Sequence, residues 1–129
     1  MIGYWGYLQF ETNDAWLQYP ENIERTVKGR WKTVYPADGG RPRRIFQGAD
    51  VGTITFTMYL DQRFNSNIRD LLAQFTIWVN EGIAQELVIG TKPLGFNKWV
   101  CVKAVEKFRE VLHNGVIASA AVEVTLEEY

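Results

Sequence analysis

Residues 99–111, WVCVKAVEKFREV, and residues 116–128, VIASAAVEVTLEE, are two long runs of strand-forming residues on either side of LHNG at 112–115. An Asn-Gly step between two such runs predicts an antiparallel hairpin. A two-residue turn at Asn114-Gly115 would place Glu106 opposite Glu123, which is a like-charge clash. A three-residue loop instead gives Gly115 the left-handed position of a bulged turn, which glycine adopts without strain. We therefore expect the three-residue loop.

This register predicts which side chains share a face of the hairpin. One face carries the pairs Val102–Leu126, Ala104–Val124 and Phe108–Ala120, and the other carries Lys103–Thr125, Val105–Glu123 and Lys107–Ala121. Lys107 and Glu123 then become diagonal neighbours of opposite charge. Glu106 and Glu110 fall near the apolar face towards the turn, so we expect the hairpin to leave the core before its tip.

The length of the hairpin leads to the same expectation. A strand from Trp99 to Leu112 spans about 46 Å at roughly 3.3 Å per residue. A compact chain of 129 residues has a diameter of only about 36 Å. The hairpin must therefore bend or project, and a projecting hairpin exposes strand edges that a partner subunit can cover.

The rest of the chain predicts further strands and one helix. Strands are expected at residues 4–12, 23–35, with a possible bulge at Gly29, 51–60 and 84–90, among about seven in all. The helix is expected at about residues 66–81, with Asn65 or Ser66 as its cap and Gly82 at its end. Its apolar stripe consists of Ile68, Leu71, Leu72, Phe75, Trp78 and Val79. These elements predict an α+β fold in a single domain, residues 1–129: a mostly antiparallel β-sandwich or partly closed barrel, with one main helix and the long C-terminal hairpin.

Composition indicates a folded chain with a real core. Hydrophobic residues make up 47% and aromatic residues 14%, and the net charge is −1, so no bulk attraction to nucleic acid or acidic membranes is expected. No apolar run is long enough for a transmembrane helix, and the first residues lack the pattern of a signal peptide. The single cysteine, Cys101, excludes an internal disulfide and suits the cytosol. The aromatic residues Tyr4, Trp5 and Tyr7 fit either an interface or the core of a sheet.

Charge is distributed unevenly along the sequence. Residues 25–44 contain seven Lys or Arg and one Asp, whereas the remainder contains seven cations and fourteen anions. One interpretation is a solvated basic strand pair. The alternative is a pair of unlike surfaces, basic and acidic, which suits head-to-tail assembly of subunits. A nucleic-acid site is less favoured, since only Trp31 and Tyr35 could stack on bases there.

The sequence offers no constellation for catalysis. His113 lies at a turn without a second histidine or a cysteine pair, and is expected to be a surface residue. Cys101 lies within a strand and is expected to be a packed small side chain. Nucleotide-binding, metalloprotease and serine-hydrolase motifs are absent. We therefore expect no enzyme activity, no cofactor and no metal.

An ordered series of segments resembles one protein family. The series begins with Gly6, Phe10, Tyr19, Arg30-Trp31 and Arg41-Pro42. It continues with FQGADVGTITFTMYL at 46–60, IRDLLAQF at 68–75, NEG at 80–82, LVIG at 87–90, PLGFNKWV at 93–100, KFREVLHNG at 107–115 and VEVTLEEY at 122–129. Together they resemble the GpU family of phage tail proteins, found in P2-like contractile phages and in related phage-tail-like bacteriocins. The match spans nearly the whole chain.

The resemblance implies a structural component of a contractile tail, required for tail assembly. It implies a baseplate-proximal ring around the tail tube, six-fold, assembled in the bacterial host cytoplasm as part of a virion or tail-like particle. Its partners would be other copies of itself and other tube and baseplate proteins, with no nucleic acid, membrane or small-molecule substrate. The alternative is a small β-rich module that binds nucleic acid or a small molecule. The candidate intersubunit contacts are Arg25, Arg30, Trp31, Arg41, Arg43, Arg44, Phe108, Arg109, Leu112, Glu123, Glu127 and Glu128.

Overall fold

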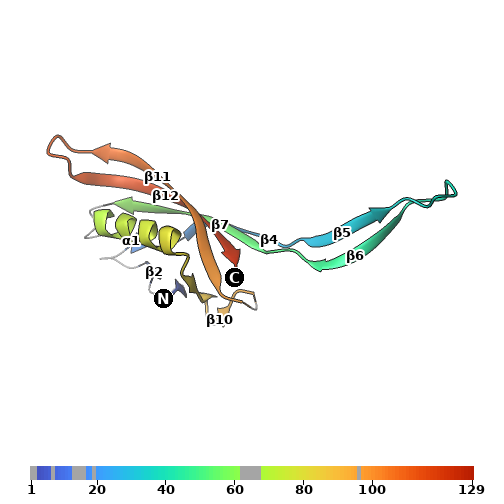
Figure 1. Ribbon diagram of the computed structural model, residues 1–129. Coiled ribbons are helices and arrows are strands. Elements are labelled where there is room, and N and C mark those ends of the chain that lie inside the picture. The colour runs from blue at the N-terminus through green and yellow to red at the C-terminus, as the bar shows by residue number, and fades with distance from the viewer. Residues whose placement is uncertain (1–2, 7, 13–16, 19, 62–67, 96) are drawn as a thin grey trace.

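The computed structural model describes residues 3–6, 8–12, 17–18, 20–61, 68–95 and 97–129 (Figure 1). The main sheet has the order β4 (Pro20–Thr26), β7 (Thr53–Asp61), β12 (Ile117–Glu128), β11 (Trp99–Val111), β8 (Ala84–Gln85). A smaller sheet has the order β10 (Lys92–Pro93), β9 (Leu87–Ile89), β1 (Gly3–Trp5), β2 (Leu8–Thr12), β3 (Leu17–Gln18). A two-stranded ribbon is formed by β5 (Gly29–Val34) and β6 (Arg43–Ala49). Every strand pair in the described part of the chain is antiparallel.

Helix α1 (Ile68–Glu81) and the smaller sheet cover the same face of the main sheet (Figure 1). Phe10 of the smaller sheet meets Phe56 of the main sheet edge to face, with ring centroids 5.7 Å apart. Trp5 meets Trp78 of α1 in the same way at 4.9 Å. These rings close one apolar core between the layers. The predicted α+β class, with one main helix and a long C-terminal hairpin, is confirmed.

The periodic patterns of the sequence correspond to what is buried. In α1, the predicted stripe faces the core, with four residues buried (Ile68, Leu72, Phe75 and Trp78) and two packed against them at its margin (Leu71 and Val79). Gly82 ends the helix in the left-handed conformation, at φ +60°, and its N–H donates to the carbonyl of Trp78 at 3.1 Å. The predicted caps Asn65 and Ser66 lie outside the described residues.

Strand β7 follows the period-two pattern expected of a strand with one covered face. Ile54, Phe56, Met58 and Leu60 are buried. The alternate side chains Thr53, Thr55, Thr57 and Tyr59 point away from the core and are half-buried or exposed. The main sheet therefore has one face against α1 and the smaller sheet, and one open face.

The register of the C-terminal hairpin is confirmed along most of its length. Five of the six predicted pairs are present, from Lys103–Thr125 to Phe108–Ala120. The sixth, Val102–Leu126, is wrong, because a bulge at Val102 brings Cys101 opposite Leu126. At the turn, the N–H of Leu112 donates to the carbonyl of Val116 at 2.8 Å, and Gly115 has φ +83°. The loop is therefore the three-residue one.

Other strands differ from the sequence-based expectations. Residues 4–12 are not one strand: β1 and β2 pair with each other, Trp5 opposite Leu8, and Gly6 has φ +57° between them. Residues 84–90 form two strands in two different sheets. Residues 23–35 extend across β4 and β5, and the expected irregularity at Gly29 appears as a register shift. Because of such breaks, the described residues contain twelve strands rather than about seven.

Two ends of the molecule project from the body (Figure 1). The distal part of the β11–β12 hairpin extends past the helix, and from Lys107 to Val116 its residues are exposed. The longer projection is the ribbon of β5, β6 and the loop between them, residues 29–49, which we call the arm. It continues from β4 and β7, and the N–H of Asp50 donates to the carbonyl of Lys28 at 2.8 Å where it joins the body. The expectation that the C-terminal hairpin leaves the core before its tip is confirmed. The interpretation of the basic segment as a solvated strand pair agrees with β5 and β6, but the projection of these strands as an arm was not predicted.

Candidate subunit-contact surfaces

The arm carries aromatic residues without a core beneath them. Trp31 and Phe46 face each other across β5 and β6, with ring centroids 5.0 Å apart, and the Arg44 guanidinium lies 4.9 Å from the Trp31 ring centroid. Trp31 remains 51% exposed and Phe46 56% exposed. A two-stranded ribbon without a packed face is at best marginally stable in water. The arm therefore presents an exposed aromatic surface, and contact of that surface with another molecule would stabilise the ribbon.

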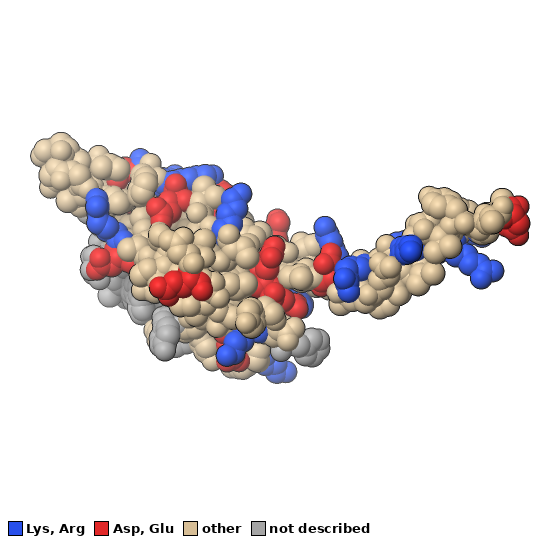
Figure 2. All heavy atoms as spheres, viewed as in Figure 1, with Lys and Arg blue, Asp and Glu red and all other residues tan. Residues whose placement is uncertain are grey.

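The basic side chains of the arm are spread along it (Figure 2). Arg30 Nη2 donates to the carbonyl of Gln47 at 3.2 Å, which ties one guanidinium to the opposite strand. Three more arginines line a surface hollow of about 920 Å³ at the distal end, together with Val34 and Pro36: Arg41, Arg43 and Arg44. The one acidic residue there, Asp38, accepts a hydrogen bond from the N–H of Gly40 at 2.9 Å within the turn. The arm thus presents a net positive surface.

The distal C-terminal hairpin is a second exposed surface, at the other end of the molecule. Phe108 is 52% exposed, and Val111, Leu112 and Val116 are exposed with it. The Arg109 guanidinium lies 5.5 Å from the Tyr59 ring centroid. Arg69 of α1 donates to the carbonyl of Gly115 at 3.3 Å, which ties the hairpin loop to the helix. This apolar tip is therefore held in place by two arginines.

The acidic candidates lie on the body. Glu127 and Glu128 lie beside the joint with the arm: Glu127 lines a hollow with Lys28 and Asp50, and the N–H of Glu128 donates to the carbonyl of Gly52 at 3.1 Å. Glu123 forms an ion pair with Lys107 at 2.6 Å, the diagonal contact that the register predicts. The Glu128 carboxylate accepts a hydrogen bond from Asn97 Nδ2 at 3.3 Å and is thus used within its own chain. Glu127 lies at the end of β12, opposite Thr53. Arg25 lies on β4 in the body, so it does not belong to the arm surface with which the sequence grouped it.

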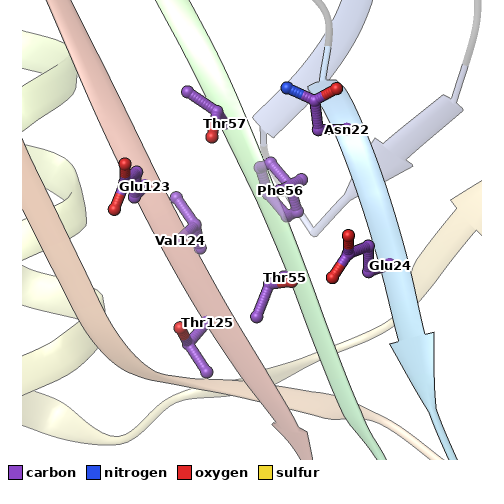
Figure 3. A pocket seen from close by; sticks show the side chains of 8 residues that line it. All are labelled: Asn22, Glu24, Thr55, Phe56, Thr57, Glu123, Val124 and Thr125. Carbon is purple, nitrogen blue, oxygen red and sulfur yellow. The ribbon is translucent and has the colours of Figure 1, made fainter.

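The open face of the main sheet holds a feature that the sequence did not reveal. A hollow of about 250 Å³ lies over β4, β7 and β12 (Figure 3), and its lining includes Glu24, Thr55, Thr57, Glu123 and Thr125. A second hollow, of about 500 Å³, is lined in part by Thr26, Thr53 and Glu127. We call this surface, residues 24, 26, 53, 55, 57, 123, 125 and 127, the threonine trough. The alternation of Thr53, Thr55 and Thr57 was visible in the sequence, but the strands flanking them were not.

The residues that the sequence analysis considered for catalysis, metal binding or an aromatic interface have structural roles or lie on the surface, where the structure describes them. Cys101 is 1% exposed, and its burial raises the pKa of the thiol to about 11, although Sγ also donates to the carbonyl of Lys103. His113 is exposed in the hairpin turn, as expected. Trp5 belongs to the core, Tyr4 is half-buried, and Tyr7 lies outside the described residues. Within the described ranges, no group of three or more His, Cys, Asp or Glu is placed to hold a metal ion, and no helix has the length and apolarity to cross a membrane.

The molecule has a small core and two projecting β-ribbons, each bearing exposed apolar residues, which is an arrangement typical of proteins that contact other proteins. The comparison with protein families agrees: the family described as Phage P2 GpU matches residues 6–129. The chain therefore belongs to the GpU family and is a phage tail protein. The resemblance drawn from the sequence is confirmed. No curated protein matches the chain.

Proposed function

We propose that this protein is a baseplate-proximal component of a contractile phage tail, or of a related tail-like particle, that forms a ring around the tail tube and is required for tail assembly. Membership of the GpU family supports the tail role. The ring, its position and its six-fold order are parts of the proposal that the family resemblance leads us to expect.

The observation that carries the proposal is the arm. Its strands bury no residue of their own, yet they hold Trp31, Ile45 and Phe46, each more than half exposed. Exposed apolar residues grouped in this way mark contact surfaces. A ring of subunits would cover the arm without requiring a larger core in each chain.

The distal C-terminal hairpin supplies a contact of a different kind. Phe108 and Leu112 provide apolar surface, and Arg109 provides charge, at the opposite end of the molecule from the arm (Figure 1). Contacts at two opposite ends suit a heterologous arrangement, in which unlike surfaces of successive subunits meet, and a ring forms where the rotation between subunits closes. Other tube and baseplate proteins would contact the remaining surface.

A complementation experiment tests this function. Particles made without the protein should lack complete tails, and the wild-type chain supplied in trans should restore them. Electron microscopy of the restored particles should place a ring of this protein at the baseplate end of the tube. Complete tails in its absence, or its location elsewhere in the particle, would refute the proposal.

One observation keeps the alternative, a nucleic-acid binding module, open to test. The arm combines arginines with Trp31 and Tyr35, the residue types that hold phosphates and stack on bases. That function predicts retention on a DNA column that declines steeply with rising salt. The tail role predicts no such retention once the arm is buried in assembled particles.

A further inference from the structure

We propose that the threonine trough is the docking site for the arm of a neighbouring copy of this chain. The inference rests on the proposed ring and identifies the surface of the next subunit that covers the arm. In this proposal, the acidic surface of one subunit binds the basic arm of the next.

The register places the members of the trough on one face of the sheet. Thr55 lies directly opposite Glu24 on β4 and Thr125 on β12. On the same three strands, Thr53 lies opposite Thr26 and Glu127, and Thr57 lies opposite Glu21 and Glu123. Directly opposed residues of antiparallel strands point to the same side. The two hollows are therefore neighbouring sections of one surface that follows β7.

The trough has the opposite charge to the arm. Beside Thr53, Thr55 and Thr57, this face of β4 and β12 carries four carboxylates, those of Glu21, Glu24, Glu123 and Glu127. A fifth, Asp61, lies on the same face at the far end of β7. The one cation of these strands, Arg25, lies opposite the buried Ile54 and so belongs to the other face. The arm, in contrast, carries five Lys or Arg and one Asp between residues 29 and 49. Complementary charges of this kind orient partners and exclude wrong ones.

Three lysines border the trough and offset part of its negative charge. Two belong to β11, and the third, Lys28, lines the larger hollow together with the carboxylate of Asp50. Lys103 lies opposite Thr125, and Lys107 forms the ion pair with Glu123. In that pair the lysine side chain is 58% exposed and the glutamate 49% exposed. An exposed ion pair contributes little to stability, so an arm arginine can replace Lys107 as the partner of Glu123 at small cost. The trough remains a net acidic site.

Its own arm cannot fill the trough. Two residues, Val27 and Lys28, join β4 to β5, and three, Asp50 to Gly52, join β6 to β7. The Asp50–Lys28 hydrogen bond closes this joint, and the arm runs away from the body (Figure 1). The arm strands and the trough are also similar in extent, roughly 15–20 Å each at about 3.3 Å per residue. A second copy therefore supplies the occupant that matches in charge and length.

Charge exchange provides the main test, with incorporation into tails as the measurement. We expect Arg43→Glu with Arg44→Glu, and separately Glu24→Lys with Glu123→Lys, each to reduce incorporation at least about tenfold. The variant with all four substitutions should regain incorporation, because the reversed arm then meets a reversed trough. Glu81→Lys with Glu86→Lys makes the same charge change at exposed positions outside the trough, and should incorporate normally.

Cross-linking provides the second test, on assembled particles. Lys32→Cys combined with Thr55→Cys, treated with a short bismaleimide, should yield a ladder of linked copies, and neither single variant should. The native Cys101 is buried and does not compete. Rings without a ladder, or an arm reversal that no trough reversal rescues, would overturn the docking site and leave the proposed function intact. Absence of the wild-type protein from tails would refute the proposed function itself.

Discussion

Trp31 and Phe46 lie directly opposite each other on the two strands of the arm, and their rings meet edge to face at 5.0 Å. Aromatic pairs of this kind stabilise a pair of strands. Both rings nevertheless remain more than half exposed. The pair therefore stabilises the ribbon locally while leaving an aromatic surface for a partner.

Replacement of Trp31 by alanine should separate stability from assembly. Because the ring lies outside the core, we expect the free energy of unfolding to change by less than about 1 kcal/mol. Incorporation into tails should decline strongly, since an exposed tryptophan at an interface is a common hot spot. Ile77→Ala, at a 43% exposed position on α1, serves as the control and should leave incorporation unchanged. A large loss of stability in Trp31→Ala would contradict this division.

Trp5 should show the reverse behaviour. It is fully buried, packs against Trp78, and donates from Nε1 to the carbonyl of Trp99 at 3.2 Å. Trp5→Ala should lower the free energy of unfolding by about 3–5 kcal/mol, through the cavity and the lost hydrogen bond. Urea unfolding followed by far-ultraviolet circular dichroism measures this without relying on tryptophan emission. A midpoint equal to that of Trp31→Ala would show that Trp5 is not a core residue.

Two glycines should respond differently to alanine. At Gly115, with φ +83°, an added Cβ would meet nothing within 4 Å, so the cost is the left-handed backbone alone, about 1–2 kcal/mol. At Gly3, the Cβ would collide with the backbone carbonyl of Val88, and β1 could not pair with β9 in its present register. Thermal unfolding should therefore show a larger decrease for Gly3→Ala than for Gly115→Ala. The opposite order would argue against the pairing of β1 with β9.

The buried thiol of Cys101 predicts a dependence on pH. Burial raises its pKa to about 11 in the folded chain, above the value of 9.0 for an unperturbed thiol. The contribution of the neutral Cys101 thiol to the free energy of unfolding is therefore complete below about pH 9, and it is lost as the pH rises towards 11. Alkylation of the native protein at neutral pH should be slow, and should become fast after unfolding in urea. Equal rates in both states would show that the thiol is accessible. Cys101→Ser, with no thiol, serves as the control for alkylation elsewhere.

The elements that could be read from the sequence are those whose patterns are local. The helix stripe, the alternation of β7 and the three-residue turn at Gly115 each depend on neighbours in the chain or on one hairpin partner. The register of β11 and β12 followed from charge pairing, and differed where a bulge inserts Val102 and at a second irregularity near the turn, where Glu110 pairs with Ser119. The ordered series of segments also identified the family, which the match over residues 6–129 confirms.

Tertiary structure alone decided where the excess length of the chain goes. The sequence favoured the C-terminal hairpin as the projecting element, but β7 and β8 border most of its base, and only its distal part extends. The arm extends further, because β5 and β6 pair only with each other. The threonine trough likewise needs β4, β7 and β12 side by side, although β7 and β12 are more than fifty residues apart in the sequence. Side-chain alternation predicts that a strand has two faces, but only the packing of distant strands decides which face is covered and which is left for a partner.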